Sequence, residues 1–235
     1  MNVVITGASR GIGFETVKSL TKSGVLKIIG ISRNYKQLCQ LKELCSQLSM
    51  TEFIPIQYDF QQIVASESKL VGLVKQHMNH IDILINNAGN MVSKPFEQIS
   101  ADEINRLFTV NYLTAALLIK NFLPLLKAGQ AHVVNITSIG GFQGSVKFRG
   151  LSHYSASKAA LASLTECLAE EYKKDGIVFN ALALGAVQTE MLAEAFPNYK
   201  APTTAEQMGE FIANFSMNGK AFFNGKILPV SISTP

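Results

Sequence analysis

The stretch Val3-Val4-Ile5-Thr6-Gly7-Ala8-Ser9-Arg10-Gly11-Ile12-Gly13 decides the fold of this chain. Its apolar start predicts a short buried strand, and apolar residues spaced three to four apart over 14–23 predict a helix directly after it. The three glycines lie between these elements, where residues without a Cβ permit a tight turn and let backbone N–H groups approach an anion at the helix N-terminus. Their spacing, G-x-x-x-G-x-G, differs from the more general G-x-G-x-x-G turn and is weak evidence on its own.

Strand-length apolar runs alternate with helical patterns along the rest of the chain. This alternation predicts a parallel sheet that is covered by helices on both faces and joined by right-handed crossovers. Pro124 lies inside the fourth helical pattern and is expected to kink or end that helix near Phe122 or Leu123. The predicted strands are Val3–Ile5, Ile28–Ile31, Phe53–Ile56, Ile81–Ile85, His132–Ile136, Ile177–Leu182 and Lys226–Ser231, and the predicted helices span 14–23, 35–48, 61–78, 101–127 and 154–174.

Length and composition favour one large domain over residues 1–235. Of these 235 residues, 47% are hydrophobic and 16% are charged, which suits a chain that buries a sizeable core. There is no stretch of about 18 uninterrupted apolar residues, and Met1 stands directly before the first strand. We therefore expect neither a membrane span nor a signal peptide, and we predict a soluble, cytoplasmic protein.

Charge and metal-ligand spacing exclude two further classes of function. The net charge of +4 is small and the basic residues are scattered, so nucleic acid is not an expected partner. Cys39, Cys45 and Cys167 lack the spacing of metal ligands and are interpreted as reduced, mostly buried thiols. The four histidines show no ligand spacing either, so no metal site is expected.

Two further motifs carry chemistry. Asn86-Asn87-Ala88-Gly89 follows the fourth predicted strand, and Tyr154 and Lys158 lie four residues apart on the fifth predicted helix. Residues at i and i+4 share a helix face, so the ammonium of Lys158 can lie beside the phenol of Tyr154 and favour its ionised form. A phenol with an ordinary pKa of about 10 exchanges protons poorly at neutral pH and needs such help.

With the glycine turn, these motifs occur in the order found in the short-chain dehydrogenase/reductase family, which the chain resembles from residue 1 to about residue 191. The resemblance implies a single-domain Rossmann fold with a doubly wound, seven-stranded parallel sheet. It implies that Tyr154 is the general acid, and that Lys158 assists it and holds the nicotinamide ribose. It also implies that Ser138 orients the substrate carbonyl, with Thr137 as the neighbouring alternative. Asn111 corresponds to the asparagine that holds a water and relays protons.

The end of the second strand is expected to select the cofactor. An acidic residue there would favour NAD, but the residues are Ser32-Arg33-Asn34. The guanidinium of Arg33 can bind a phosphate through two parallel hydrogen bonds, and Arg10 can approach the same group from the other side, so NADP(H) is predicted over NAD(H). The resemblance places Asp59 against the adenine ring. The predicted cofactor-binding residues are Gly7, Ser9, Arg10, Gly11, Ile12, Gly13, Arg33, Asp59, Phe60, Asn87, Ala88, Gly89, Val110, Tyr154, Lys158, Gly185, Val187 and Thr189.

The chain departs from the family pattern in regions near the expected substrate pocket, which loops at about 140–153 and 190–205 are predicted to shape. Tyr154 follows Ser138 by 16 residues, about three more than the family usually has. In this stretch Lys147 and Arg149 are candidates for binding an acidic or phosphorylated substrate. Leu184-Gly185 replaces the usual Pro-Gly, and we expect this turn to be looser. The usual Asp-Gly-Gly is missing from the C-terminal segment.

The expected activity is NADPH-dependent reduction of a small-molecule ketone to a secondary alcohol, with 3-oxoacyl compounds as one form of substrate. Two alternatives stay open: an NAD(P)-dependent alcohol, sugar or steroid dehydrogenase, and a non-catalytic NADP-binding sensor with the same fold. We expect a homodimer through the helices at 101–127 and 154–174, and leave a tetramer open. The small residues that would permit close packing there are Ala115, Ala116, Ala159 and Ala162.

Overall fold

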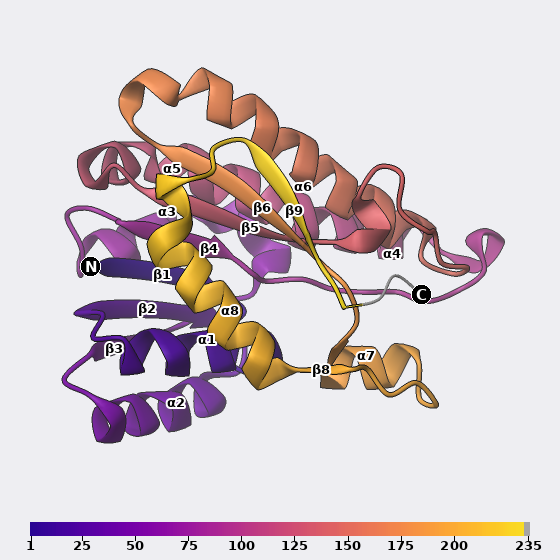
Figure 1. The fold of residues 1–235 in the computed structure, drawn as a ribbon, viewed down its shortest axis with the longest axis horizontal. Helices are drawn as coiled ribbons and strands as arrows, with labels where there is room; N and C mark the ends of the chain where they lie inside the picture. The colour runs from indigo at the N-terminus through magenta and orange to yellow at the C-terminus, as the bar shows by residue number, and fades with distance from the viewer. Residues whose placement is uncertain (233–235) are drawn as a thin grey trace.

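A computed structural model of the protein describes residues 1–232, and its central feature is a seven-stranded parallel sheet (Figure 1). The strand order is β3-β2-β1-β4-β5-β6-β9, so the winding direction reverses between β1 and β4. This is the doubly wound Rossmann arrangement, and the predicted fold class is confirmed. The strands are β1 (Asn2–Thr6), β2 (Lys27–Ser32), β3 (Glu52–Gln57), β4 (Ile83–Asn86), β5 (His132–Ser138), β6 (Val178–Leu184) and β9 (Lys226–Val230).

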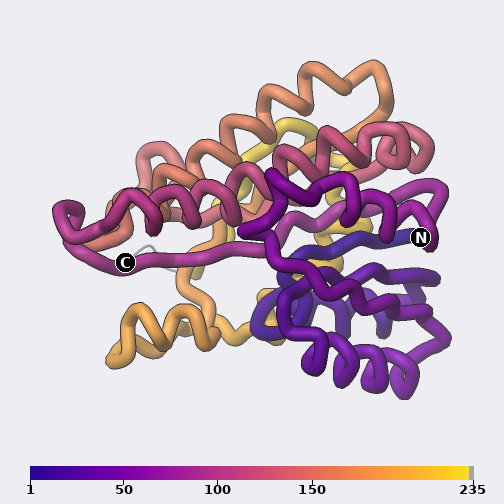
Figure 2. The backbone as a smooth tube through the Cα atoms, turned by 180° about the vertical axis from the view of Figure 1, so that it is seen from behind, coloured from indigo at the N-terminus to yellow at the C-terminus, as the bar shows by residue number. Residues whose placement is uncertain are grey.

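Helices cover both faces of the sheet, as Figures 1 and 2 show from opposite sides. One face packs against α1, α2 and α8, and the other against α3, α5 and α6. The strands are buried on both faces, which is why they read as continuous apolar runs in the sequence. The helices of the two layers are α1 (Gly11–Lys22), α2 (Tyr35–Leu48), α3 (Ile63–Lys75), α5 (Thr114–Gly129), α6 (Ser152–Glu171) and α8 (Ala205–Asn218).

The predicted helix at 101–127 is a continuous run of three parts. α4 (Ala101–Phe108) passes through a π-helical turn at Thr109–Leu113 into α5. The expectation that the helix ends near Pro124 is wrong, because α5 continues to Gly129. Pro124 has no N–H, so the carbonyl of Lys120 loses its hydrogen bond within the helix. Both residues are exposed to solvent, so water can donate to this carbonyl instead.

The same run is apolar and long enough to cross a membrane by length and composition. Core helices pass that test too, and Leu118, Phe122 and Leu126 of α5 are buried in the core beneath the sheet. Two of the alanines proposed for a dimer contact, Ala115 and Ala162, are also buried within the subunit. The other two of these four alanines, Ala116 and Ala159, are partly exposed.

The C-terminal quarter contains elements that the sequence analysis did not predict. α7 (Glu190–Ala195) follows β7 (Val187–Gln188), which pairs in parallel with β8 (Thr203–Thr204). α8 begins with a capping box in which the Thr204 hydroxyl and the Gln207 amide each bind the other's backbone N–H. Part of the expected departure after the last strand falls on residues 233–235, which lie outside the described residues.

His132 links three elements at the end of the sheet opposite the glycine turn. Its side chain is fully buried, its Nδ1 donates to the Ser216 carbonyl of α8 at 2.9 Å, and its Nε2 accepts from Asn180 Nδ2 at 3.0 Å. The Asn180 amide also donates to the Phe223 carbonyl at 2.9 Å. Burial lowers the pKa of His132 to about 4, and the charge of Lys220 acts in the same direction. The ring is therefore neutral at physiological pH.

This burial predicts an acid-sensitive fold. Because the folded pKa lies below the unfolded value of about 6.5, the unfolded state binds more protons between these values, and stability falls as the pH is lowered through that window. From pH 7 to about 5, we expect a loss on the order of 2 kcal/mol in the free energy of unfolding, measured by urea denaturation. The variant His132→Gln should show a flatter pH dependence, whereas His77→Gln, at an exposed position, should keep the wild-type slope. Equal slopes for all three proteins would contradict this assignment.

Candidate active site

The glycine turn is held at the point where β1 and β4 end. Thr6 Oγ1 accepts hydrogen bonds from the backbone N–H groups of Asn87 at 3.0 Å and Ala88 at 2.9 Å. In return, the Asn87 amide donates to the carbonyls of Thr6 at 3.0 Å and Gly7 at 3.2 Å. These contacts join the glycine turn to the Asn86–Gly89 motif, which lies more than 70 residues further along the chain.

Two features of the turn require glycine. Gly7 and Gly11 have φ values of +72° and +55°, a region that residues with a Cβ rarely adopt. A Cβ on Gly13 would lie 2.2 Å from the Gly7 carbonyl oxygen, so any side chain there would push helix and turn apart. The result is a close approach of the first turn of α1 to the end of β1.

The N-terminus of α1 is open toward ligand. No side chain caps it and its first turn contains no acidic residue, so the first N–H groups of the helix lack a side-chain partner. Unpaired N–H groups and the positive end of the helix dipole together suit a phosphate. This turn therefore fits the pyrophosphate of a dinucleotide.

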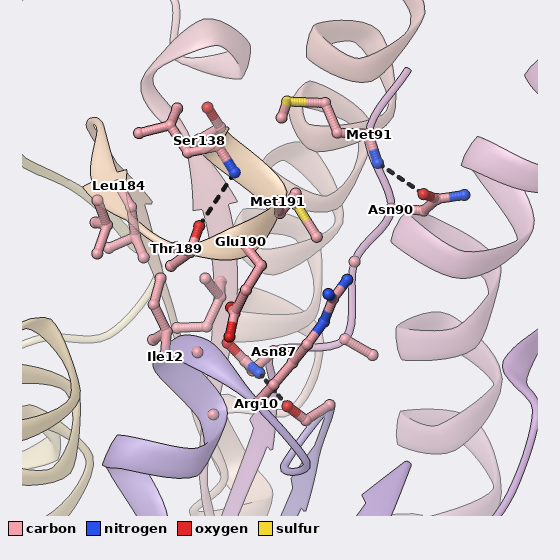
Figure 3. A pocket seen from close by; sticks show the side chains of 18 of the residues that line it. Arg10, Ile12, Asn87, Asn90, Met91, Ser138, Leu184, Thr189, Glu190 and Met191 are labelled. Carbon is pink, nitrogen blue, oxygen red and sulfur yellow. Dashed lines mark hydrogen bonds between the residues drawn. The ribbon is translucent and has the colours of Figure 1, made fainter. Parts of the chain in front are cut away.

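A cavity of about 960 Å³ runs along the carboxyl edge of the sheet above this turn. Every residue predicted for catalysis or cofactor binding lines it, except Asn111. Figure 3 shows Ser138, Met91 and Met191 at the upper end of the view and Arg10, Ile12 and Asn87 at the lower end. This volume is at the upper end of the range of about 300–1,000 Å³ that is typical of small-molecule and cofactor sites, so the cavity has room for an extended ligand.

The residues predicted to bind the 2′-phosphate and the adenine ring all line the cavity. Arg33 and Asp59 both line it, and Arg33 is exposed at the end of β2. Arg10 also lines the cavity but pairs with Glu194 of α7 at 3.6 Å, a contact not foreseen from the sequence. Both side chains of this pair are largely exposed, so the pair itself contributes little to stability.

Tyr154 and Lys158 lie on one face of α6, near the end of β5. Lys158 is 4% exposed and its Nζ donates to the Ile136 carbonyl of β5 at 2.9 Å. The Tyr154 phenol interacts with the Ser138 hydroxyl, which also accepts from the Gly140 N–H at 3.2 Å. The three predicted catalytic side chains on β5 and α6 are thus brought together.

The acid–base properties of these groups differ from the expectation. Burial raises the pKa of Tyr154, and the hydrogen bond with Ser138 opposes that shift only in part. Burial lowers the pKa of Lys158 to about 8. The expected lowering of the Tyr154 pKa by Lys158 is therefore not found in the protein alone, because desolvation outweighs it and the ammonium is directed to a backbone carbonyl.

Asn111 lies in the π-helical turn behind Lys158 and is 1% exposed. Its Oδ1 accepts from the Asn90 N–H at 2.7 Å, and its Nδ2 donates to the Asn90 carbonyl at 2.9 Å and to Ser157 Oγ at 2.9 Å. The side chain therefore joins the loop after β4 to α6. This placement is next to the predicted catalytic group and outside the cavity wall.

The two predicted substrate loops form the far wall of the cavity. Phe148 and Leu151 of the first loop, and Phe196 and Tyr199 of the second, line it. Lys147 does not: its Nζ donates within its own loop to the Phe142 carbonyl at 2.6 Å and to Ser145 Oγ at 3.0 Å.

The turn that replaces Pro-Gly remains ordered by backbone pairing. The Gly185 N–H donates to the Val230 carbonyl of β9 at 2.9 Å, and Leu184 is buried at 6% exposure. The expected loosening is thus countered by the neighbouring strand.

Several lining residues were missed by the sequence analysis. Glu190 lies over the glycine turn, with its carboxylate 3.6 Å from where a Cβ of Gly11 would lie, and the motif around Thr189 could have indicated it. Met91 follows the Asn86–Gly89 motif directly. Among the others, Gln37, Gln61 and Asn90 are marked by no local pattern. Asn34 lies in the motif after the second predicted strand, and Met191 and Leu192 lie in the predicted loop 190–205, although none of the three was named as a lining residue.

Cysteine and histidine chemistry is not part of this site. The three cysteines are free; Cys45 is buried, Cys39 is partly exposed and Cys167 is exposed, so the prediction of burial holds fully only for Cys45. No cluster of three potential metal ligands occurs within residues 1–232. His153 stacks on the ring of Phe96, with ring centroids 5.2 Å apart.

The chain is similar in sequence to proteins that are named oxidoreductases or reductases. An uncharacterized oxidoreductase of Staphylococcus aureus (strain MW2) is 28% identical over 210 residues, which cover 89% of this chain and 87% of that protein. A fatty acyl-CoA reductase of Acinetobacter baylyi is 31% identical over 203 residues, which cover 81% of this chain and 63% of the longer relative.

Solved structures and a family model complete the comparison. L-Sorbose reductase from Gluconobacter frateurii, solved with NADPH and L-sorbose, has a TM-score of 0.88 at 20% identity over 99% of this chain and 95% of that one, which shows a shared fold. The family model described as short chain dehydrogenase matches residues 1–200. The chain therefore belongs to the short-chain dehydrogenase family and is an NAD(P)-dependent dehydrogenase or reductase.

Proposed function

We propose that the protein is an NADPH-dependent reductase that converts a ketone to a secondary alcohol. The observation that carries this proposal is the group of Ser138, Tyr154 and the buried Lys158 at one end of a cavity whose other end is the uncapped N-terminus of α1. The name of the Acinetobacter relative, a reductase, supports the direction of the reaction.

The chemistry divides between coenzyme and protein. When bound, a nicotinamide coenzyme supplies the hydride. Ser138 and Tyr154 hold the carbonyl oxygen by hydrogen bonds that strengthen as negative charge develops there. Tyr154 then donates its proton to that oxygen. Its raised pKa keeps the phenol protonated at neutral pH, which suits a general acid.

Lys158 and Asn111 support this proton transfer. The ammonium of Lys158 stabilises the phenolate left on Tyr154 and binds the ribose hydroxyls of the coenzyme. Asn111 fixes the Asn90 backbone on one side and Ser157 on the other, and so maintains the helix face that presents Lys158. A water molecule beside Asn111 would relay a proton from solvent back to Tyr154 by way of Lys158.

Charge supports NADPH as the preferred coenzyme. Arg33 lies at the end of β2, where the coenzyme's 2′-phosphate would be recognised, and Arg10 lines the same cavity. The L-sorbose reductase with the same fold was solved with NADPH. No acidic side chain follows β2 directly to repel a 2′-phosphate, since Arg33 and Asn34 stand there.

The remaining predictions belong to the same proposal. Residues 1–235 form one coenzyme-binding domain, and loops 140–153 and 190–205 select the substrate. A homodimer would use the exposed faces of α4, α5 and α6, with Ala116 and Ala159 available for close packing. The protein acts in the cytoplasm on a small molecule.

Replacing the general acid should abolish turnover and leave coenzyme binding intact. For Tyr154→Phe we expect kcat to fall by about 10²- to 10⁴-fold over a panel of ketones, quinones and 3-oxoacyl thioesters, because general acid catalysis typically contributes that much. The ring remains, so the Kd for NADPH, measured by fluorescence, should change less than threefold. Tyr35→Phe, on an exposed part of α2, is the matched control. Turnover by Tyr154→Phe at the control rate would rule out this role.

The lowered pKa of Lys158 predicts that kcat/KM decreases on the alkaline side of the pH profile. Lys158 is cationic below about pH 8 and neutral above it. The ratio kcat/KM for NADPH reports the free enzyme, so it should fall about tenfold per pH unit above that value. In Lys158→Arg the charge persists to much higher pH, and this decrease should disappear even if the absolute rate is lower. A wild-type profile that stays flat to about pH 10 would contradict the assignment.

Coenzyme preference can be tested by direct titration. Arg33→Ala should weaken NADPH binding by about 10- to 100-fold, since hydrogen bonds to charged groups contribute about 1.5–3 kcal/mol, and should leave NADH binding nearly unchanged. Lys36→Ala, exposed on the neighbouring turn of α2, should alter neither. Equal affinity of the wild type for both coenzymes would refute the preference for NADPH.

A further inference from the structure

The end of the cavity beyond Ser138 and Tyr154 has an apolar wall. The side chains that form it come from three separate loops, one after β4, one before α6 and one around α7. Figure 3 shows two of them, Met91 and Met191, at the same end of the cavity as Ser138. The residues are Met91, Phe148, Leu151, Met191, Leu192 and Phe196.

Apart from Lys158, the charged side chains that line the cavity lie in its other parts. Arg33 and Asp59 lie at the ends of β2 and β3, and Arg10 and Glu190 lie at the glycine turn. Lys147 is bound within its own loop. Arg149 lines a second cavity of about 750 Å³, which shares Phe148 and Leu151 with the first. Lys147 and Arg149, the candidates for binding an acidic substrate, therefore do not line the end of the cavity at Ser138 and Tyr154.

Few polar groups are available to a substrate at this end. The Asn90 side-chain oxygen already accepts from the Met91 N–H at 2.9 Å. Leu184, where a proline was expected, adds another apolar surface next to Ser138 in the sheet, since the two residues pair in register. Thr137 Oγ1 donates to the Leu182 carbonyl at 3.2 Å, and Thr189 Oγ1 accepts from the Leu192 N–H at 3.3 Å. Tyr199, 39% exposed, adds a further hydroxyl to the lining.

We infer that this site selects ketones whose substituents are apolar, such as alkyl chains, over polyhydroxylated ketoses. This inference rests on the proposed function. An alkyl chain gains affinity for each methylene that leaves water. A sugar would instead lose the hydration of several hydroxyls that find no partner on this wall, and each unpaired group weakens binding.

The test compares substrates that differ only in this property. With saturating NADPH, kcat/KM is measured for the 2-alkanones from 2-butanone to 2-decanone and for L-erythrulose, the trihydroxylated counterpart of 2-butanone. We expect kcat/KM to rise about three- to fourfold per added methylene over the first members. L-Erythrulose should fall below 2-butanone, although its hydroxyls activate the carbonyl.

Two variants test whether the apolar wall causes the rise of kcat/KM with chain length. Phe148→Ser should at least halve the gain per methylene, because it places a hydroxyl where the chain lies. Val146→Ser is the matched control: it lies in the same loop, is 52% exposed and does not line the cavity. Circular dichroism and the Kd for NADPH report whether each variant is folded.

A binding measurement separates this inference from the proposed function. The 2-alkanols from 2-butanol to 2-decanol form a dead-end complex with the NADPH-loaded protein, so calorimetry measures their affinity without turnover. Affinity for the alkanols that rises with chain length supports the inference even if no ketone is reduced. The absence of ketone reduction would overturn only the proposed reductase activity. Reduction without chain-length dependence, or a preference for L-erythrulose, would overturn the inference and leave the reductase activity standing.

Discussion

The hydroxyl of Thr6 accepts two successive backbone N–H groups, and the organisation of the site depends on this contact. It joins the ends of β1 and β4, the two strands between which the winding of the sheet reverses. With the Asn87 amide on the Gly7 carbonyl, it holds the glycine turn, with its positive φ values, close to α1. The open helix N-terminus follows from that arrangement, because nothing within the turn can cap it.

Desolvation governs the other end of the cavity. Lys158 is buried and Tyr154 is half-buried, and desolvation lowers the pKa of the Lys158 ammonium and raises the pKa of the Tyr154 phenol, so that both favour their neutral forms. The hydroxyl of Ser138 and the carbonyl of Ile136 orient them, so their positions do not depend on direct contact between the two.

The sequence predicted the parallel sheet, its seven strands and most of its helices, since buried parallel strands have continuous apolar runs and surface helices have apolar periodicity. The sequence also predicted that the site residues gather at one edge of the sheet, because most of them follow the carboxyl ends of parallel strands. Several features escaped it, including the whole of α8. α7 is short and has weak periodicity, the solvent exposure that lets Pro124 remain within α5 is a tertiary property, and the Arg10–Glu194 pair joins residues far apart in the chain. The apolar wall was also not predictable residue by residue, since three unrelated loops form it.

The π-helical turn at Thr109–Leu113 makes the site dependent on the number of residues in a helix as well as on their identity. One extra residue in a turn rotates everything after it by about 100° relative to an uninterrupted α-helix. α4 and α5 consequently keep different phases, which lets Asn111 face Asn90 while Leu118 and Phe122 face the sheet. Removing a single residue here would restore regular helical geometry and at the same time turn either Asn111 or the apolar face of α5 out of place. Insertions and deletions in this segment are therefore more restricted than substitutions at most of its exposed positions.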